Sequence, residues 1–316
     1  MAISVTAEIE PPRVEKPVKP ATRTAAAGAV RIGISGWRYK GWRGVFYPKR
    51  LAQHRELSYA GGVFPTIEIN GTFYRLQSPE LFRKWAEATP AGFVFALKGS
   101  RYITHMLRLK NVELALARYF ASGPLELGPK LGPILWQFPE NFRFNAERIE
   151  SFFKLLPRDT LAIAELARKA KGRGRRRTAA DIAARPVRHA MEIRSESFRT
   201  PEFIALLRAY DVALVCADTV EWPLLMDVTS DFVYCRLHGS QVLYASGYDE
   251  IALQTWATRV TAWARGREPA DAERVIDRPG PKRPSRDVFV YFDNDAKVRA
   301  PFDAQRLRRI VDERLG

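Results

Sequence analysis

Eight short apolar segments constrain the fold of this chain more than any other feature. Helical patterns separate most of them, and no two lie close enough for a tight hairpin, so the strands have to pair in parallel through right-handed crossovers. The sequence therefore predicts a single-domain α/β protein, a (β/α)8 TIM-type barrel over residues 30–316. The predicted strands cover 30–37, 66–73, 93–99, 133–138, 189–194, 212–218, 232–239 and 288–294.

Two short motifs mark helix starts between these strands. Ser-Pro-Glu at 78–80 and Thr-Pro-Glu at 200–202 each offer a hydroxyl N-cap, a proline at the first helical position and an acid in the first turn. Apolar side chains at helical spacing also follow Asn145 and Asp249. The alternative fold, an open doubly wound sheet, lacks its Gly-x-Gly-x-x-Gly loop, because Gly-Ile-Ser-Gly at 33–36 has another spacing.

Composition limits the class of protein. Hydrophobic residues make up 46% of the 316-residue chain, which is enough for a large core. No apolar run approaches the roughly 18 residues of a membrane span, and the N-terminus lacks a signal-peptide pattern, so a cytoplasmic protein without a membrane partner is predicted. Cys216 and Cys235 are expected on opposite faces of their strands, as core residues rather than a disulfide. The oligomeric state is left open.

Three segments fall outside the barrel pattern. Residues 1–29 mix proline, alanine and both charge signs without periodicity, which predicts a disordered tail. Residues 168–188 hold nine Lys or Arg against one acid, a large part of the net charge of +16, and a second basic insertion covers 267–286. Both insertions precede a strand, so both are predicted opposite the strands' carboxyl ends. The first is either a solvated loop or a nucleic-acid-binding arm.

Polar side chains gather where the predicted strands end. Alternation along a strand would point them into the barrel, where layered aliphatic side chains are normal. Polar groups are costly there unless they line a solvated pocket, although any one of them could instead form a structural ion pair. The predicted ring contains Glu68, Asn70, Lys98, Gln137, Glu192, Arg194, Asp218, Arg236, His238 and Asp293, and loops add Tyr74, His105 and Asn294.

The cations of this ring predict its ligand. Lys98, Arg194 and Arg236 suit a phosphate or carboxylate, because guanidinium groups bind such oxygens in bidentate fashion. Proton transfer would then fall to carboxyl and imidazole groups beside the bound anion. The predicted catalytic residues are Glu68 and Glu192, as general base or acid, and His238, as second proton carrier.

No cofactor is predicted for this ring. A multinuclear metal site is disfavoured because the chain has only four histidines and because nearby cations would repel a divalent ion. The alternative is a single Mg²⁺ or Mn²⁺ held by Glu192, Asp218 and Asp293.

Several motifs in chain order carry a family resemblance. They are Gly-Ile-Ser-Gly-Trp at 33–37, Phe-Tyr-Pro at 46–48, Glu-Ile-Asn at 68–70, Thr-Phe-Tyr at 72–74, Lys98 with Thr-His at 104–105, Gln-Phe-Pro at 137–139, Glu-Ile-Arg at 192–194, Tyr-Cys-Arg-Leu-His-Gly at 234–239 and Tyr-Phe-Asp-Asn at 291–294. From Arg31 to about Leu307 the chain thereby resembles the domain-of-unknown-function 72 family, also called YecE-like. Ser195 and Phe198 depart from its usual His and Trp.

This resemblance implies a TIM-type barrel but no established reaction. A kinship of shape with apurinic endonucleases and xylose isomerases makes nucleic-acid processing a first hypothesis by fold analogy. Two functions therefore stay open. One is an enzyme acting on a phosphate-bearing or other anionic substrate, a small molecule or nucleic acid, by Glu and His acid–base chemistry at the barrel mouth. The other is a non-catalytic module that binds nucleic acid or an anionic metabolite.

Overall fold

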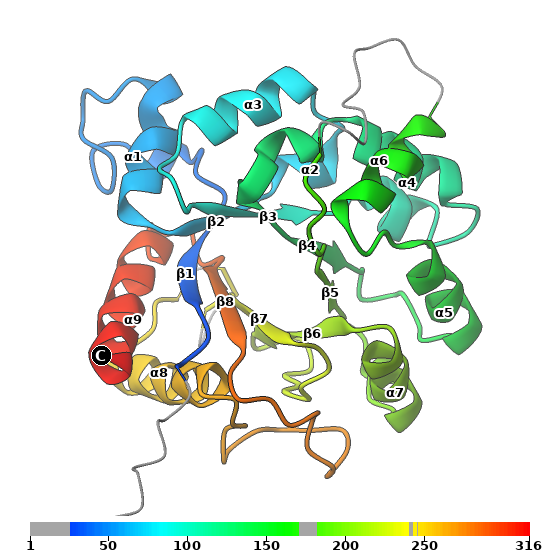
Figure 1. Cartoon of the computed structure of the whole chain (residues 1–316). Coiled ribbons are helices and arrows are strands. Elements are labelled where there is room, and N and C mark those ends of the chain that lie inside the picture. Colours follow the sequence, from blue (N-terminus) through cyan, green and yellow to red (C-terminus); the bar gives the residue numbers. More distant parts are fainter. Residues whose placement is uncertain (1–25, 171–181, 240–242, 245) are drawn as a thin grey trace, which may run out of the picture.

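Eight parallel strands pair in sequence order and close into a barrel, because β8 pairs back onto β1. The computed structural model describes residues 26–170, 182–239, 243–244 and 246–316. Figure 1 looks down the barrel, with the strands as an inner ring. The predicted (β/α)8 fold is thereby confirmed. The strands are β1 (Val30–Ser35), β2 (Thr66–Ile69), β3 (Val94–Lys98), β4 (Leu131–Gln137), β5 (His189–Glu192), β6 (Val212–Asp218), β7 (Phe232–Leu237) and β8 (Asp287–Phe292).

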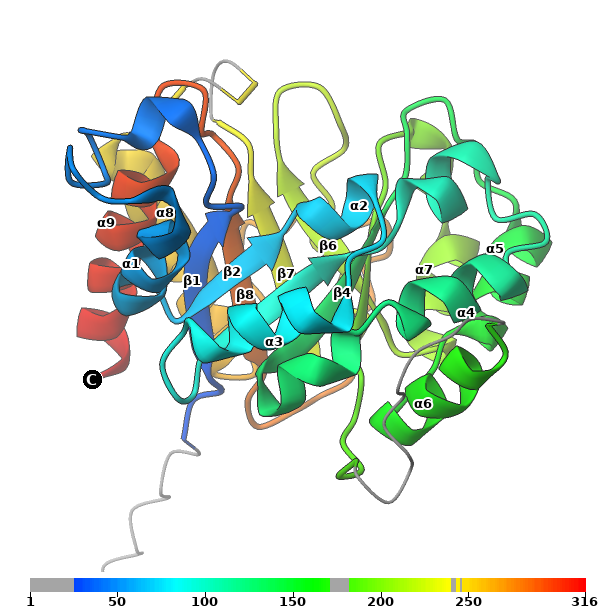
Figure 2. The same ribbon diagram turned by 90° about the horizontal axis from the view of Figure 1, so that it is seen from above.

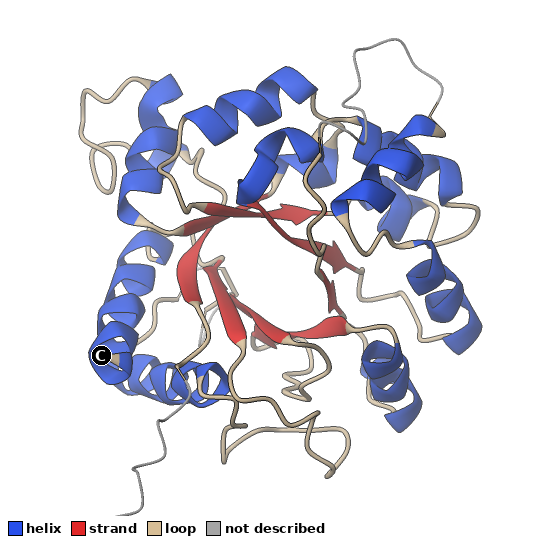
Figure 3. Ribbon diagram, viewed as in Figure 1, coloured by secondary structure: helices blue, strands red, loops and turns tan. Residues whose placement is uncertain are grey.

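Helices surround the ring of strands (Figure 3). The two predicted N-caps are confirmed, since Ser78 Oγ accepts from the backbone N–H of Leu81 and Thr200 Oγ1 from that of Phe203. The α-helices are α1 (Glu56–Val63), α2 (Gly71–Tyr74), α3 (Pro79–Glu87), α4 (Glu113–Ala121), α5 (Ala146–Leu155), α6 (Thr160–Arg168), α7 (Pro201–Ala209), α8 (Glu250–Ala264) and α9 (Ala300–Leu315). Short 3-10 helices span Lys40–Trp42, Gln53–Arg55, Pro124–Lys130 and Glu196–Phe198, and a π-helical turn spans Tyr102–Met106.

The strands separate two apolar layers. The larger layer fills the space between strands and helices, and a smaller cluster, which includes Ala96, Leu135, Tyr234 and Tyr291, fills the barrel interior. Polar atoms inside find partners, as between Tyr291 Oη and Thr66 Oγ1 at 2.7 Å. The interior is thus packed, as in other TIM barrels, and supports the polar groups at the strands' carboxyl ends. Figure 2 shows the strands side-on, with these ends at the top.

The inward face of β6 differs from the prediction. Ala213, Val215 and Ala217 pack in the barrel interior, so Asp218 points outward. Its Oδ2 accepts a hydrogen bond of 2.8 Å from Trp256 Nε1 on α8. The prediction failed because β6 is apolar on both faces, as strands of parallel sheets often are. Such a strand has no alternation of polar and apolar residues that would indicate which side chains point inward.

The same error affected the cysteines. Cys216 on β6 and Cys235 on β7 are direct neighbours in register, and both lie in the layer between strands and helices. The prediction that they occupy opposite faces is therefore wrong. Both thiols are buried and free.

The boundaries of other predicted segments also shift. The second predicted strand ends at Ile69, because α2 begins two residues later. Order begins before Val30: the backbone N–H of Gly28 donates to Ala264 O, and that of Ala29 to Asp287 Oδ1. The rest of the predicted tail, 1–25, lies outside the described residues.

The two basic insertions adjoin the strand starts where the structure describes them. Residues 171–181 of the first insertion lie outside the described residues, while 185–188 line a cavity together with Arg31 and Val94 at the beginnings of β1 and β3. The second, 267–286, is tied to the barrel through the backbone N–H of Val275, which donates to Asp227 Oδ2. Over the described ranges, no helix has both the length and the apolar character that a membrane crossing requires.

Candidate active site

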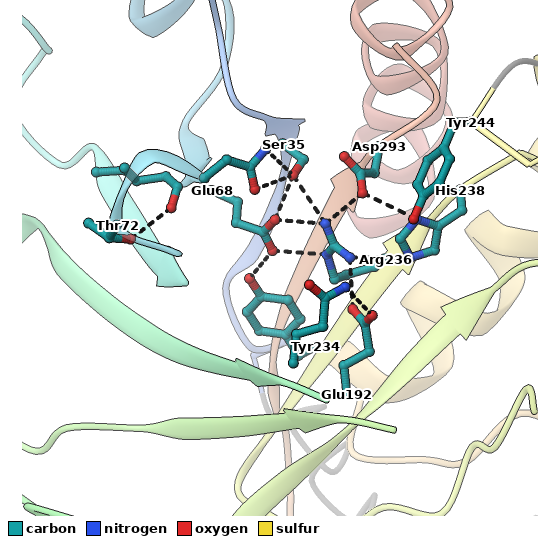
Figure 4. A network of polar contacts seen from close by, with 12 residues as sticks. Ser35, Glu68, Thr72, Glu192, Tyr234, Arg236, His238, Tyr244 and Asp293 are labelled. Atoms are coloured by element: carbon teal, nitrogen blue, oxygen red, sulfur yellow. Dashed lines mark hydrogen bonds and ion pairs between the residues drawn. The ribbon is translucent and has the colours of Figure 1, made fainter. Parts of the chain in front are cut away.

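Arg236 is the centre of the polar network at the strands' carboxyl ends (Figure 4). β7 projects its side chain into the barrel, where it is fully buried. The guanidinium pairs with Glu68 at 2.9 Å, Glu192 at 2.7 Å and Asp293 at 2.7 Å, and it also contacts Ser35 Oγ and His238 Nε2. These partners occupy all five N–H donors of an arginine. Arg236 therefore organises the carboxylates, and its predicted role in clamping a ligand conflicts with its geometry.

Glu68 is one of the carboxylates that Arg236 holds. Its Oε1 accepts from Ser35 Oγ at 2.5 Å, and its Oε2 accepts from Tyr234 Oη at 2.6 Å. Arg236 donates to both oxygens, and the side chain is fully buried. Asn70 extends this cluster toward solvent, with its Nδ2 3.1 Å from Ser35 Oγ. Glu68 thus has no oxygen exposed to a substrate.

Glu192 lies on the other side of Arg236 and is also fully buried. Its Oε1 accepts from Gln137 Nε2 at 2.7 Å and from Arg194 Nε at 3.0 Å. Burial by itself would raise the pKa of this carboxyl, but the charges of Arg236 and Arg194 hold that pKa well below its usual range. Glu192 consequently stays ionised and is unsuited to donate a proton.

His238 is buried beneath the same network. Arg236 Nη1 lies 3.3 Å from Nε2 of the imidazole. A guanidinium only donates, so Nε2 accepts and the ring proton belongs on Nδ1. That nitrogen is 3.2 Å from Asp293 Oδ2, although outside hydrogen-bond geometry. Like Glu68 and Glu192, His238 does not line the cavity, so the three predicted catalytic residues form the layer beneath it.

A cavity of about 430 Å³ opens above this layer. Seven predicted site residues meet in its wall: Asn70, Tyr74, Lys98, His105, Gln137, Arg194 and Asp293. Tyr39, Phe73, Tyr244 and Asp295, which were not predicted as site residues, complete the lining.

Lys98 at the end of β3 is a cation that faces this cavity. Its side chain is mostly buried, and its Nζ lies 4.6 Å from the centre of the Phe73 ring. No residue in the described ranges forms a hydrogen bond or ion pair with Nζ. Burial, and after it the charge of Arg236, lower the pKa of Lys98 to about 8. Part of this amine is therefore neutral near physiological pH.

Arg194 is the second cation at the cavity. Its guanidinium carbon lies 3.6 Å from the centre of the Trp222 ring, and its Nε is bound to Glu192. Its Nη2 makes only a long contact of 3.5 Å with Tyr244 Oη, and no described residue accepts from Nη1. One edge of this guanidinium is therefore available for an anion.

Asp295 is a functional candidate that was not predicted. It lies three residues beyond β8 and lines the cavity. Burial, and after it the charge of Asp293, raise its pKa to about 6. For Asp293 burial acts in the same direction, but Arg236 overcomes it and lowers the pKa. Two neighbouring carboxyls with pKa values pushed apart are typical of acid–base sites. The sequence feature that could have identified Asp295 is an acidic residue in the loop that follows a barrel strand.

His105 reaches the cavity as an uncharged group. Burial, and after it the charge of Arg194, lower its pKa to about 4. Its Nδ1 lies 2.8 Å from Thr104 Oγ1, and its ring packs edge-on against Phe73. It can exchange hydrogen bonds with a ligand but adds no positive charge at neutral pH.

Asp218 and Asn294 are predicted site residues that the structure places elsewhere. Asp218 binds Trp256, as described above, while Asn294 is fully buried and donates from Nδ2 to Ser246 O and Asp303 Oδ2. Asp218 therefore cannot serve as a ligand of the predicted Mg²⁺ or Mn²⁺ site. The other two predicted ligands, Glu192 and Asp293, are paired with Arg236. Among the described residues, no group of three His, Cys, Asp or Glu is arranged to hold a metal ion.

The ion pairs of Glu192 predict how the stability of the protein depends on pH. A carboxyl with a depressed folded pKa contributes stability that is present above its unfolded pKa, here 4.5, and lost as the pH falls toward the folded value. Glu192→Gln removes this contribution. The gap in free energy of unfolding between the wild-type protein and the variant should therefore narrow as the pH falls from 7 to 3, measured by urea denaturation. A gap that stays constant or widens would contradict the depressed pKa.

A family model with the description "Protein of unknown function DUF72" matches residues 31–315 of this chain. Among curated proteins, the chain is 28% identical over 125 residues to the UPF0759 protein YunF of Bacillus subtilis, covering 38% of this chain and 43% of YunF. It is also 28% identical over 145 residues to the UPF0759 protein YecE of Escherichia coli K12, covering 39% of this chain and 50% of YecE. The matches thus span about half the length of these curated relatives or less.

Solved structures show the same fold. A DUF72 family protein from Thermotoga maritima aligns with a TM-score of 0.68 at 23% identity, covering 90% of this chain and 99% of that one. A DUF72 family protein from Enterococcus faecalis aligns with a TM-score of 0.64 at 17% identity, covering 90% and 95%. At these identities the likeness supports the barrel architecture alone.

Proposed function

This chain belongs to the DUF72 family, whose function is unknown, and from its own site we propose that it is an enzyme that acts on a phosphate-bearing or carboxylate-bearing substrate. The reaction would take place in the cavity at the carboxyl ends of the strands. One observation carries this proposal: two cations with free donors face the same cavity as a carboxyl whose pKa lies near neutrality.

The charges at the cavity support an anionic substrate. Glu68, Glu192 and Asp293 are the carboxylates that compensate Arg236, so a ligand meets the less compensated Lys98 and Arg194. Charge-assisted hydrogen bonds from these groups are worth about 1.5–3 kcal/mol each. The proposed anion site therefore differs from the predicted one. Lys98 and Arg194 contact the ligand, whereas Arg236 holds the carboxylates beneath the cavity.

Acid–base chemistry in this site is assigned to Asp295. A group with a pKa of about 6 can both accept and release a proton near neutral pH, where catalytic groups work best. Asp293, held ionised by Arg236, supplies a fixed negative charge beside it. Glu68, Glu192 and His238 then serve as positioning residues, since they hold Arg236 and the cavity floor.

Binding of inorganic phosphate tests the anion site. Lys98→Met and Arg194→Met should each weaken binding about tenfold or more, because each removes one charge-assisted hydrogen bond. Lys154→Met is the matched control: Lys154 lies on the exposed face of α5, paired with Glu150, and its variant should bind like the wild-type protein. Titration calorimetry gives the affinities, and melting curves confirm folding. Equal affinities in all four proteins would contradict the anion site.

A non-catalytic nucleic-acid-binding module is the second candidate. It is favoured by aromatic side chains at the rim of the mouth, where Tyr74 is 67% exposed and Tyr102 46% exposed. Arg75 and Arg101 are exposed next to them in the chain, and bases can stack on aromatic rings beside such cations. On this alternative, Tyr74→Ala would weaken binding of a single-stranded oligonucleotide, whereas Lys98→Met would leave it unchanged.

A further inference from the structure

Lys98 has features that anion binding alone does not explain. A lysine that only holds an anion works best fully charged, whereas burial lowers the pKa of Lys98 to about 8. Its Nζ has no hydrogen-bond or ion-pair partner among the described residues, and it faces a cavity that also contains Asp295, a carboxyl with a pKa of about 6. A desolvated amine of this kind is a nucleophile toward carbonyl carbon.

We propose that Lys98 forms an imine with the carbonyl group of the substrate, which is therefore an aldehyde or ketone that also bears a phosphate or carboxylate. The inference rests on the proposed function, because it uses the same cavity and the same anion site. It adds the reacting group of the substrate and the covalent role of Lys98.

The arrangement of charges suits such an intermediate. Arg194 offers its free edge to the anionic group, while the carbonyl carbon approaches Nζ of Lys98. The carboxylates of Glu68 and Asp293 stabilise positive charge at Nζ. A protonated imine keeps a positive charge on that nitrogen, so the same carboxylates stabilise the intermediate.

The step balances without an oxidant or reductant. The lone pair of the neutral amine forms a bond to the carbonyl carbon, and the electron pair of the C=O bond moves to oxygen. The nitrogen then releases one proton and the oxygen takes one up, which gives a neutral carbinolamine. Asp295 then protonates this hydroxyl, water leaves, and the nitrogen lone pair forms the C=N bond. The products are one protonated imine and one water, and Asp295 recovers its proton from solvent.

Two other lysines show what distinguishes Lys98. The Nζ of Lys130 donates to Ala86 O at 2.5 Å and to Thr89 O at 2.6 Å, so it is occupied by backbone carbonyls. The Nζ of Lys154 is paired with Glu150 at 2.9 Å. Neither lines the cavity, so both serve as internal references for non-specific reaction with aldehydes.

Borohydride trapping on the 316-residue chain tests this inference. Glyceraldehyde 3-phosphate represents a small sugar phosphate, and a single-stranded oligonucleotide with an abasic site represents an aldehyde within nucleic acid. Borohydride reduces the imine to a stable amine, which intact mass and peptide mapping then detect. We expect one adduct per chain, at Lys98, absent from Lys98→Arg and Lys98→Met and retained in Lys154→Met.

The yield of the trapped adduct should also show whether Arg194 binds the anionic group of the aldehyde. Arg194→Met should lower trapping of glyceraldehyde 3-phosphate about tenfold but leave trapping of uncharged glyceraldehyde unchanged. Trapping should be fastest between about pH 6 and pH 8 and slower on either side, because it needs both the neutral amine of Lys98 and the protonated carboxyl of Asp295. An adduct formed with only one of the two phosphate-bearing probes identifies the source of the substrate.

Other outcomes would overturn the imine. These are no adduct with either probe, or an adduct that persists in folded Lys98→Arg at the wild-type level. If phosphate binding still depended on Lys98 and Arg194 in that case, the proposed anion site would stand and the covalent role alone would be lost. Loss of both would remove the proposed function as well.

Discussion

Replacing Arg236 with methionine is expected to lower the free energy of unfolding by about 3–5 kcal/mol, because it leaves buried carboxylates without their cation. Glu68 and Glu192 are fully buried and Asp293 nearly so, and all three pair with this guanidinium. Without it they repel one another in a medium that screens charge poorly. Chemical denaturation of the wild-type and variant proteins at pH 7 measures the difference.

Arg199→Met is the matched control for this substitution. Arg199 also pairs with two acids, Glu196 and Glu273, but all three side chains are well exposed, at 37%, 68% and 51%. Solvent-exposed ion pairs are worth about 1 kcal/mol or less. The Arg236 variant should also recover part of its stability in acid, as its carboxylates become neutral. A similar, small decrease in the free energy of unfolding in both variants would show that the buried network does not depend on Arg236 for its stability.

Replacing Gly99 with alanine is expected to cost about 1–3 kcal/mol of stability, because no space exists for a methyl group there. A Cβ at this position would lie 2.2 Å from Cε3 of Trp136, a fully buried ring that packs against Phe152 and donates to His189. Either the ring or the backbone after Lys98 has to move. We therefore expect weaker phosphate binding together with a lower melting temperature.

Gly62→Ala makes the same chemical change where space is available. Gly62 lies in α1, and a Cβ there meets no atom within 4 Å. Because alanine favours the helix over glycine, the variant should be as stable as the wild-type protein or more stable by about 1 kcal/mol. A Gly99 variant that behaved like the Gly62 variant would show that the packing around Trp136 is looser than the structure indicates.

The layered site explains why stability and function are expected to separate in these variants. Arg236 and its carboxylates fill the level below the cavity and contribute mainly to the fold. Lys98, Arg194 and Asp295 line the cavity, and on the proposed function they would contribute mainly to binding and chemistry. Substitution of Lys98 or Asp295 should therefore change affinity with little loss of stability. Substitution of Arg194, which also pairs with buried Glu192, or of a residue in the lower level should change both.

The local sequence was sufficient for the architecture. Eight apolar segments alternating with helix signals specify parallel strands with crossovers, and N-caps such as Ser78 and Thr200 act over three residues. Alternation also identified the inward side chains wherever one face of a strand carries polar groups, as in β7 with Arg236. These features depend on neighbours in the chain, so they could be read from the order of the residues.

How deeply each site side chain is buried, and which side chains pair with one another, depended instead on contacts between distant segments. Alternation placed Glu68 and Lys98 in one ring, but only the closed barrel determines that Arg236 takes the carboxylate of Glu68 and leaves Lys98 facing the cavity. β6 is apolar on both faces, so its packing against α8 sets the direction of Asp218. The pKa of Asp295 rises mainly because folding buries it, and the neighbouring Asp293, which Arg236 of another strand holds ionised, adds to this effect. Such electrostatic effects act across space between residues from different strands and loops, and a linear pattern does not contain those distances.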